Sequence, residues 1–147
     1  MSPSLHRRPC VVAIDASPDV RNLYREILQE EDYGIETFDC NEASRDALVA
    51  CQPDVVLLDC FNGYNPSGWD ILEVLSHDAD LQTVPVVICT SDARLFGVDV
   101  RNQVDKSIRI LSKPFDVRDL LGAIEASLKR QQSPSYRGGS FEVGRWL

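Results

Sequence analysis

Short apolar runs alternate with longer amphipathic stretches along most of this chain. The runs are rich in β-branched residues and carry few polar side chains, which is typical of strands buried on both faces. Four runs are clear, at 10–14, 54–58, 84–89 and 108–111, and a weaker one lies at 34–38. Together they predict the five strands of one sheet.

The stretches between these runs repeat apolar residues with the spacing of an α-helix. After the first run, Ser17 and Pro18 are of the types preferred at the N-cap and at the first helical position. Near the end of the chain, Asp116 is a candidate N-cap, and Asp119 stands in the first turn, where the helix dipole favours an acid. Both stretches therefore predict helices.

Shorter helices are expected at about 42–51, after Asn41, and at about 69–76. The segment 93–104 is interpreted as a helix although "VDV" interrupts its periodicity. Successive strand–helix units imply a parallel sheet that is covered on both faces. Right-handed crossovers make it a doubly wound α/β sheet, in which ligands bind beyond the carboxyl ends of the strands.

The composition changes near residue 131, where a polar, Gly- and Ser-rich stretch begins. We expect an N-terminal segment over 1–8, one domain over 9–130, and a flexible tail over 131–147 with an aromatic end. Two readings of the last seven residues, "FEVGRWL", stay open. They are either a disordered terminus or a short docking segment, because an aromatic-rich end is unfavourable to leave in water.

Length and charge exclude several classes of protein. The 147 residues are about one domain's worth. With 15 Lys and Arg against 23 Asp and Glu, the net charge is −8, and no basic run interleaved with aromatics could follow a phosphate backbone. Direct nucleic-acid binding is therefore not expected. No stretch approaches the roughly 18 apolar residues of a membrane span, and no apolar signal segment precedes the first strand, so we expect a cytoplasmic protein.

The five cysteines are odd in number, show no Cys-x-x-Cys pair and lie mostly inside apolar runs. We interpret them as reduced core residues rather than as metal ligands or redox groups. The two histidines, His6 and His77, are expected at the surface.

Polar residues with a common chemistry follow the predicted strands. Asp15 follows the first strand, Asp59 the third, Thr90 the fourth and Lys113 the fifth. Two carboxylates can hold a hard cation such as Mg²⁺, and a hydroxyl and an ammonium suit phosphate oxygens. Metal and ammonium would compensate Asp59, which is otherwise costly at the end of an apolar strand. Its carboxylate could attack a phosphoryl group and form an acyl phosphate.

With these motifs, the chain resembles the receiver domain of two-component response regulators over about 9–130. The resemblance rests on the Asp15 strand end, "DVVLLD", "PVVICTS" and "SKPF". It implies a flavodoxin-like fold with a five-stranded parallel sheet in the order 2-1-3-4-5. It also implies a cis peptide bond before Pro114.

The resemblance assigns a role to each residue of the set. Asp59 would accept a phosphoryl group from a phosphohistidine of a sensor histidine kinase or phosphotransfer protein. Asp15, Asp59 and the backbone carbonyl of Phe61 would bind Mg²⁺. Thr90 and Lys113 would contact the phosphoryl group, and catalysis would consist mainly of positioning and charge neutralisation.

Several positions depart from the family pattern. Ala16 stands where the family has a second acid, which should weaken Mg²⁺ binding. Ile110 replaces an aromatic residue that switches rotamer on activation, so conformational output must travel differently. Phe61 and Asp92 flank the path of hydrolytic water, and the bulk of Phe61 leads us to expect a long-lived acyl phosphate. The loop "CFNGYNPSG" lacks the usual Met-Pro.

Two functions stay open at this point. The first is a single-domain response regulator that is phosphorylated on Asp59 and signals by protein–protein contact. The second is a receiver-like interaction module that works without phosphorylation, with Ala16 and Ile110 as its signs. The resemblance also suggests a homodimer through the fourth helix, fifth strand and fifth helix.

An enzyme is not expected beyond self-catalysed phosphoryl transfer and dephosphorylation. The chain has neither Gly-x-Gly-x-x-Gly after the first strand nor a Gly-Lys-Ser/Thr loop. Cys89 and Arg94 are one residue too close for the phosphatase pattern of Cys, five residues and Arg. Asp59 also lacks the second Asp, two residues on, of haloacid-dehalogenase-type phosphatases.

Overall fold

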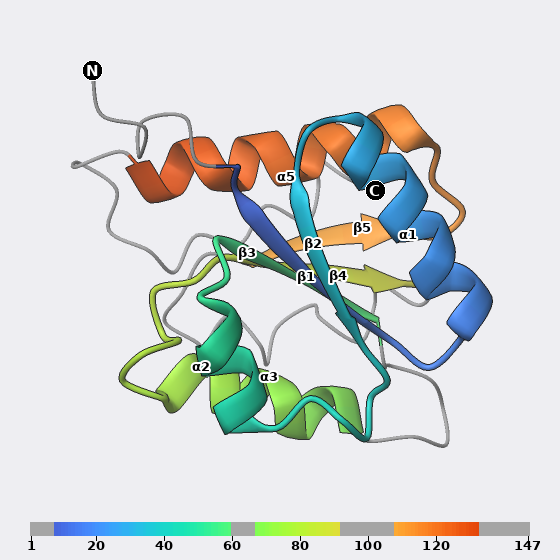
Figure 1. The fold of residues 1–147 in the computed structure, drawn as a ribbon. Coiled ribbons are helices and arrows are strands. Elements are labelled where there is room, and N and C mark those ends of the chain that lie inside the picture. The colour runs from blue at the N-terminus through green and yellow to red at the C-terminus, as the bar shows by residue number, and fades with distance from the viewer. Residues whose placement is uncertain (1–7, 60–66, 92–107, 133–147) are drawn as a thin grey trace.

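Five parallel strands form one sheet in the order β2-β1-β3-β4-β5 (Figure 1). The structure, a computed structural model, describes residues 8–59, 67–91 and 108–132. The strands are β1 (Cys10–Asp15), β2 (Gly34–Phe38), β3 (Val55–Asp59), β4 (Val86–Thr90) and β5 (Ile108–Ser112). The sequence prediction of a parallel sheet in this order is confirmed, and each predicted run overlaps its strand.

Helices cover both faces of the sheet (Figure 1). They are α1 (Pro18–Glu30), α2 (Arg45–Cys51), α3 (Ser67–His77) and α5 (Val117–Gln132). α1 and α5 lie on one face, and α2 and α3 on the other. The helix expected at 93–104 lies outside the described residues. None of the described helices is both long and apolar enough to cross a membrane.

Alternate residues of the strands feed two hydrophobic cores. In β1, Val11 and Ala13 belong to the core under α1 and α5, whereas Val12 and Ile14 belong to the core on the opposite face. All four are fully buried. The continuous apolar runs are therefore explained by a sheet that has no solvent-facing side in its centre.

The helix starts show where sequence rules held. Ser17 caps α1, its hydroxyl accepting a 3.3 Å hydrogen bond from the Val20 amide, and Pro18 is the first helical residue. Asp116 caps α5 through a 2.8 Å hydrogen bond from the Asp119 amide to its carboxylate. Both capping predictions are confirmed. α5 ends at Gln132, slightly beyond the domain end that the sequence suggested.

The predicted start of α2 is wrong. The helix begins at Arg45 with Ser44 as its N-cap, rather than after Asn41. The residues before it form a turn in which the Asp39 amide donates to the Glu42 carboxylate, and the Glu42 amide donates to the Asp39 carbonyl, both at 2.9 Å. Side chains that bond nearby backbone groups compete with helix formation, and here they delay it.

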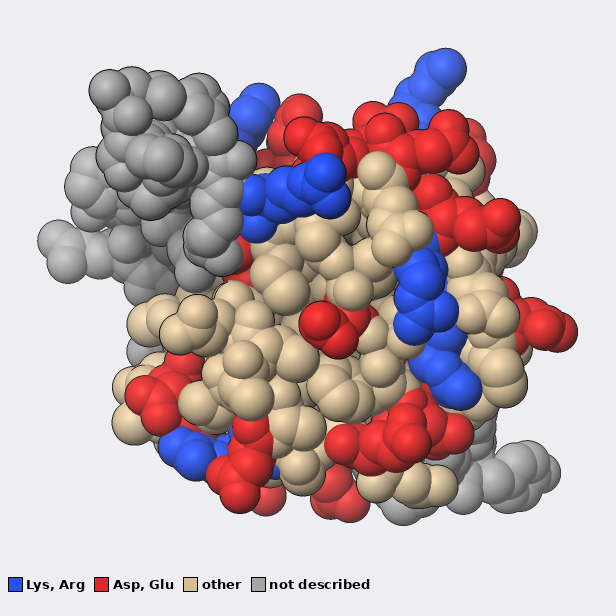
Figure 2. Space-filling view, viewed as in Figure 1, with Lys and Arg blue, Asp and Glu red and all other residues tan. Residues whose placement is uncertain are grey.

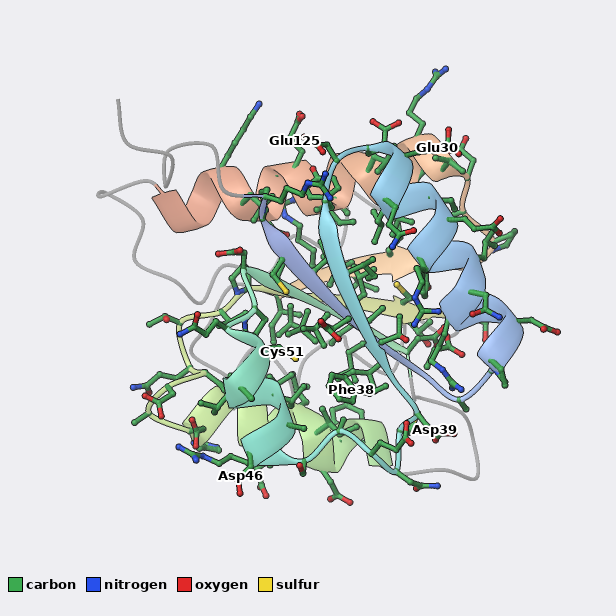
Figure 3. All side chains as sticks on the ribbon, in the orientation of Figure 1. Glu30, Phe38, Asp39, Asp46, Cys51 and Glu125 are labelled. Atoms are coloured by element: carbon green, nitrogen blue, oxygen red, sulfur yellow. The ribbon has the colours of Figure 1, made fainter. Side chains whose placement is uncertain are left out.

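The expectation that all cysteines are reduced is also wrong at one position. Cys10, Cys51 and Cys89 are free. Cys40, which is buried in the core under α2 and α3, is disulfide-bonded. Figure 3 shows Phe38 and Cys51 on this side of the sheet, where both pack against the same core.

Candidate functional site

The first two carboxylates of the predicted site lie side by side. β1 and β3 are neighbouring parallel strands, and their register pairs Asp15 with Asp59. Each residue is the last of its strand, so both stand at the carboxyl edge of the sheet. Asp15 is 5% exposed and the Asp59 side chain 10%. Parallel pairing thus places two nearly buried acids next to each other.

This environment disfavours the charged form of Asp59. Burial raises the pKa of the Asp59 carboxyl, and the neighbouring Asp15 carboxyl raises it further, while Lys113 works against both. The balance is a pKa of about 7. Asp59 is therefore an acid that a nearby cation would hold in its ionised form at neutral pH.

Lys113 reaches this pair from the end of β5. Its ammonium forms an ion pair with Oδ2 of Asp59. Burial lowers the pKa of the Lys113 amine, but contact with Asp59 outweighs burial, so the pKa is raised overall and the amine stays charged. Its amide also donates to the Thr90 carbonyl at 2.8 Å, which fixes the end of β5 against β4. The peptide bond from Lys113 to Pro114 is cis, as the resemblance implied.

Thr90 completes the described part of the edge. It is the last residue of β4 and is almost fully buried. Register pairs Thr90 with Ser112, and β4 lies directly beside β3, where Leu58 pairs with Ile88. The four strand-end residues that the sequence singled out, Asp15, Asp59, Thr90 and Lys113, therefore come together at one edge of the sheet.

One buried oxygen of the site has no partner. The Oδ1 atom of Asp15 accepts a 2.8 Å hydrogen bond from the Ser17 amide, but Oδ2 has no hydrogen-bond partner among the described residues. A buried acceptor without a donor is unfavourable, and a cation would satisfy it. Oxygen ligands from Asp15 and Asp59 suit a hard divalent ion such as Mg²⁺.

The donor set is small for a metal site. The described residues contain no group of three or more His, Cys, Asp or Glu side chains that could hold an ion. The exposed Ala16 stands directly after Asp15, where a third carboxylate would be needed. Two carboxylates fit an Mg²⁺ ion that keeps several waters. Because they carry less negative charge than three carboxylates, they should bind the ion more weakly.

A residue that the sequence reasoning missed holds the backbone of the site. The guanidinium of Arg21 donates to the Asp15 carbonyl at 2.6 Å, and it lies 3.8 Å from the Asp39 carboxylate. Arg21 stands in the first turn of α1, so it ties this helix to the end of β1. Its position shortly after Asp15 is the only signal in the sequence, and that signal is weak.

The floor of the site is buried and uncharged. Burial raises the pKa of the Cys89 thiol to about 12, and burial together with Cys89 raises the pKa of the Tyr24 hydroxyl far above its usual range. Both groups stay protonated at neutral pH. Cys89 therefore behaves as the core residue that its apolar run predicted, and a buried protonated thiol is a poor nucleophile.

The other singled-out positions have different outcomes. Ile110 is fully buried in the core on the α2 and α3 side, opposite Ile88 in the register of β4 and β5. Phe61 and Asp92 lie outside the described residues. His77 is exposed at the end of α3, as expected, and His6 lies outside the described part.

A parallel sheet in this order, with acids, a hydroxyl and a lysine at its carboxyl edge, defines a receiver-type signalling module. The family model of the response regulator receiver domain matches residues 11–125. The chain therefore belongs to the response regulator receiver family, whose members are signalling modules of two-component systems rather than conventional enzymes.

Similar proteins support the same assignment. The hybrid signal transduction histidine kinase D of Dictyostelium discoideum is 24% identical over 123 residues, which are 82% of this chain and 8% of that protein. The chain thus spans only a small part of this relative.

Two solved structures show the same fold. Chemotaxis protein CheY4 of Vibrio cholerae has a TM-score of 0.71 at 22% identity, with 83% of this chain and 100% of that chain covered. The signal receiver domain of a histidine kinase from Syntrophus aciditrophicus has a TM-score of 0.68 at 23% identity, with 86% and 96% covered.

Proposed function

We propose that the chain is a single-domain response regulator that accepts a phosphoryl group on Asp59. The donor is a phosphohistidine of a sensor histidine kinase or phosphotransfer protein, and the output is protein–protein contact. The observation that carries this proposal is the edge itself, where Asp59 pairs with Lys113 and lies beside Asp15. Membership of the receiver family supports phosphoryl transfer to an aspartate as the reaction at this edge.

The proposed phosphoryl transfer forms one bond and breaks one. A carboxylate oxygen of Asp59 forms a bond to phosphorus, while the bond from phosphorus to the donor's histidine nitrogen breaks and that nitrogen keeps the electron pair. Lys113 neutralises charge on the Asp59 carboxylate and on the incoming phosphoryl oxygens. The Thr90 hydroxyl donates a hydrogen bond to the same group once it is attached.

Mg²⁺ is the proposed cofactor, held by Asp15, Asp59 and the carbonyl of Phe61. When bound, it supplies positive charge to the transferring phosphoryl oxygens. The receiver domain of a sensor histidine kinase from Pseudomonas aeruginosa holds a magnesium ion in its active-site cleft, with a TM-score of 0.62 to this chain. Asp15 contributes the buried oxygen that lacks a hydrogen bond, and Ala16 makes the expected affinity low.

The second candidate function is a receiver-like module that works without phosphorylation. Two observations favour it: Ala16 removes a metal-binding acid, and Ile110 is locked in the core instead of an aromatic switch. Retention of all four edge residues favours the first function. The homodimer stays a prediction, because the segment 93–104, where a fourth helix is expected, lies outside the described residues.

Mass spectrometry of the intact protein after incubation with acetyl phosphate and Mg²⁺ separates the two functions. We expect one phosphoryl adduct on the parent and on Asp70→Asn, which changes an exposed acid of α3 and serves as the matched control. Asp59→Asn should carry no adduct. An unmodified parent across a wide range of Mg²⁺ concentrations would speak for the phosphorylation-independent module, and an adduct on Asp59→Asn would move the acceptor elsewhere.

A further inference from the structure

An apolar groove lies between α1 and the start of α5. Its volume is about 500 Å³, and its apolar walls come from Val20, Leu23 and Ile27 on one side and from Phe115, Val117 and Leu120 on the other. Leu23 is 52% exposed and Val117 47%. Among the described residues these are two of the three large apolar side chains that are exposed. Exposed apolar surface of this kind is typical of a binding site for another apolar segment.

We propose that the groove binds the chain's own C-terminal segment, residues 141–147, "FEVGRWL". This segment carries two aromatic residues, Phe141 and Trp146, together with Val143 and Leu147. The described part of the chain ends at Gln132, so the segment lies outside it. Aromatic side chains contribute most when they enter an apolar pocket, and this groove offers one on the same molecule.

The chain is long enough for this contact. α5 begins beside the groove and ends at Gln132, and its 16 residues span about 24 Å. Residues 133–140 can extend over about 26–29 Å, which returns Phe141 to the level of the groove. These residues include Pro, Ser and Gly, which permit the chain to reverse. A short flexible linker gives an effective concentration on the order of millimolar, so even a weak segment would stay bound.

Charge also favours this occupant. The chain beyond Gln132 carries Arg137 and Arg145 against the single acid Glu142. The way back along α5 passes acidic atoms that gather at the upper edge of Figure 2, where Figure 3 places Glu30 and Glu125. The charges of Glu142 and Arg145 balance within the docking segment, but the linker over 133–140 carries Arg137 and no acid, so the linker is attracted to such a surface.

Fluorescence of Trp146 in the full chain tests the docking. Trp69→Phe leaves Trp146 as the sole tryptophan, because the chain has two. We expect blue-shifted emission in this background, typical of a buried indole. Adding Leu23→Ser or Val117→Ser should shift the emission to that of the urea-unfolded chain. Ala50→Ser, which changes an exposed residue of α2, is the matched control and should leave the emission unchanged.

Amide NMR shifts locate the contact in the same unphosphorylated, metal-free protein. Phe141→Ala combined with Trp146→Ala should move the amide signals of residues 20–27 and 115–120 and leave those of α2 and α3 in place. Emission equal to that of the unfolded chain, with no shift at the groove, would overturn the proposal. Shifts on another face would do the same, and a blue shift that grows with protein concentration would assign the segment to a second copy. No phosphoryl donor is present, so the result is independent of the role of Asp59.

Discussion

The pKa of the Asp59 carboxyl is the net result of opposing interactions. Burial and the adjacent Asp15 raise the pKa of its carboxyl from 3.8 to about 7, and the Lys113 ion pair limits the rise. Between these two values the folded protein binds more protons than the unfolded chain. The free energy of unfolding must therefore fall as pH rises through this window, which is the reverse of an ordinary salt-bridged acid.

This balance predicts that Asp59→Asn stabilises the fold at pH 8 without divalent cations. The rise from 3.8 to about 7, which already includes the Lys113 ion pair, sets an upper limit of about 4 kcal/mol. Because charges at a partly solvated edge of the sheet are screened, we expect a gain of about 1–2 kcal/mol. The gain should vanish below about pH 4, where the Asp59 carboxyl of the parent is largely protonated in both the folded and the unfolded state. Urea unfolding at a series of pH values measures it.

Asp70→Asn, at an exposed position, should show neither the gain nor its pH dependence. If Asp59→Asn were instead less stable than the parent at every pH, the ion pair with Lys113 would outweigh the repulsion between the two acids.

The elements of the fold were predictable where local chemistry decides them. Apolar runs predicted all five strands, and the carboxyl edge of a parallel sheet brought Asp15, Asp59, Thr90 and Lys113 together without further information. The start of α2 was missed because the Glu42 carboxylate accepts from the Asp39 amide and the Asp39 carboxylate accepts from the Asn41 amide in the preceding turn. The hydrogen bond from Arg21 to the Asp15 carbonyl could not be predicted from the sequence, because it depends on how α1 packs rather than on residue spacing.

The start of α5 illustrates an element whose stability rests on two side chains. The Asp116 carboxylate accepts from the Asp119 amide at 2.8 Å, and the Asp119 carboxylate accepts from the Asp116 amide at 3.3 Å. We expect Asp116→Ala to lower the free energy of unfolding by about 1 kcal/mol, because the Asp119 amide at the helix start loses its acceptor. Urea unfolding at pH 7 measures this loss.

Arg118→Ala changes an exposed residue of the same turn, so it controls for general effects on the helix. Equal losses in both variants would show that the reciprocal hydrogen bonds of Asp116 and Asp119 contribute nothing specific.

At the scale of the whole molecule, the site and the two cores depend on the same strands. β1 and β3 end at the acids, while their preceding residues fill the cores on both faces. A ligand bound between the two strand ends therefore stabilises the entire fold and not only the edge. Metal binding should then be visible in global unfolding, and the missing acid at position 16 should limit it.

We accordingly predict that Mg²⁺ raises the Tm of the parent slightly and that of Ala16→Asp more. A third carboxylate should tighten Mg²⁺ binding by about tenfold, because ligand charge sets affinity at such sites. At Mg²⁺ concentrations well above Kd, this adds about 1.4 kcal/mol of stability and about 3–5 °C to the Mg²⁺-induced rise in Tm. Thermal unfolding with and without Mg²⁺ measures the difference. Ala50→Asp adds the same charge on α2 and should behave as the parent. An equal rise in all three proteins would mean that position 16 does not face the metal.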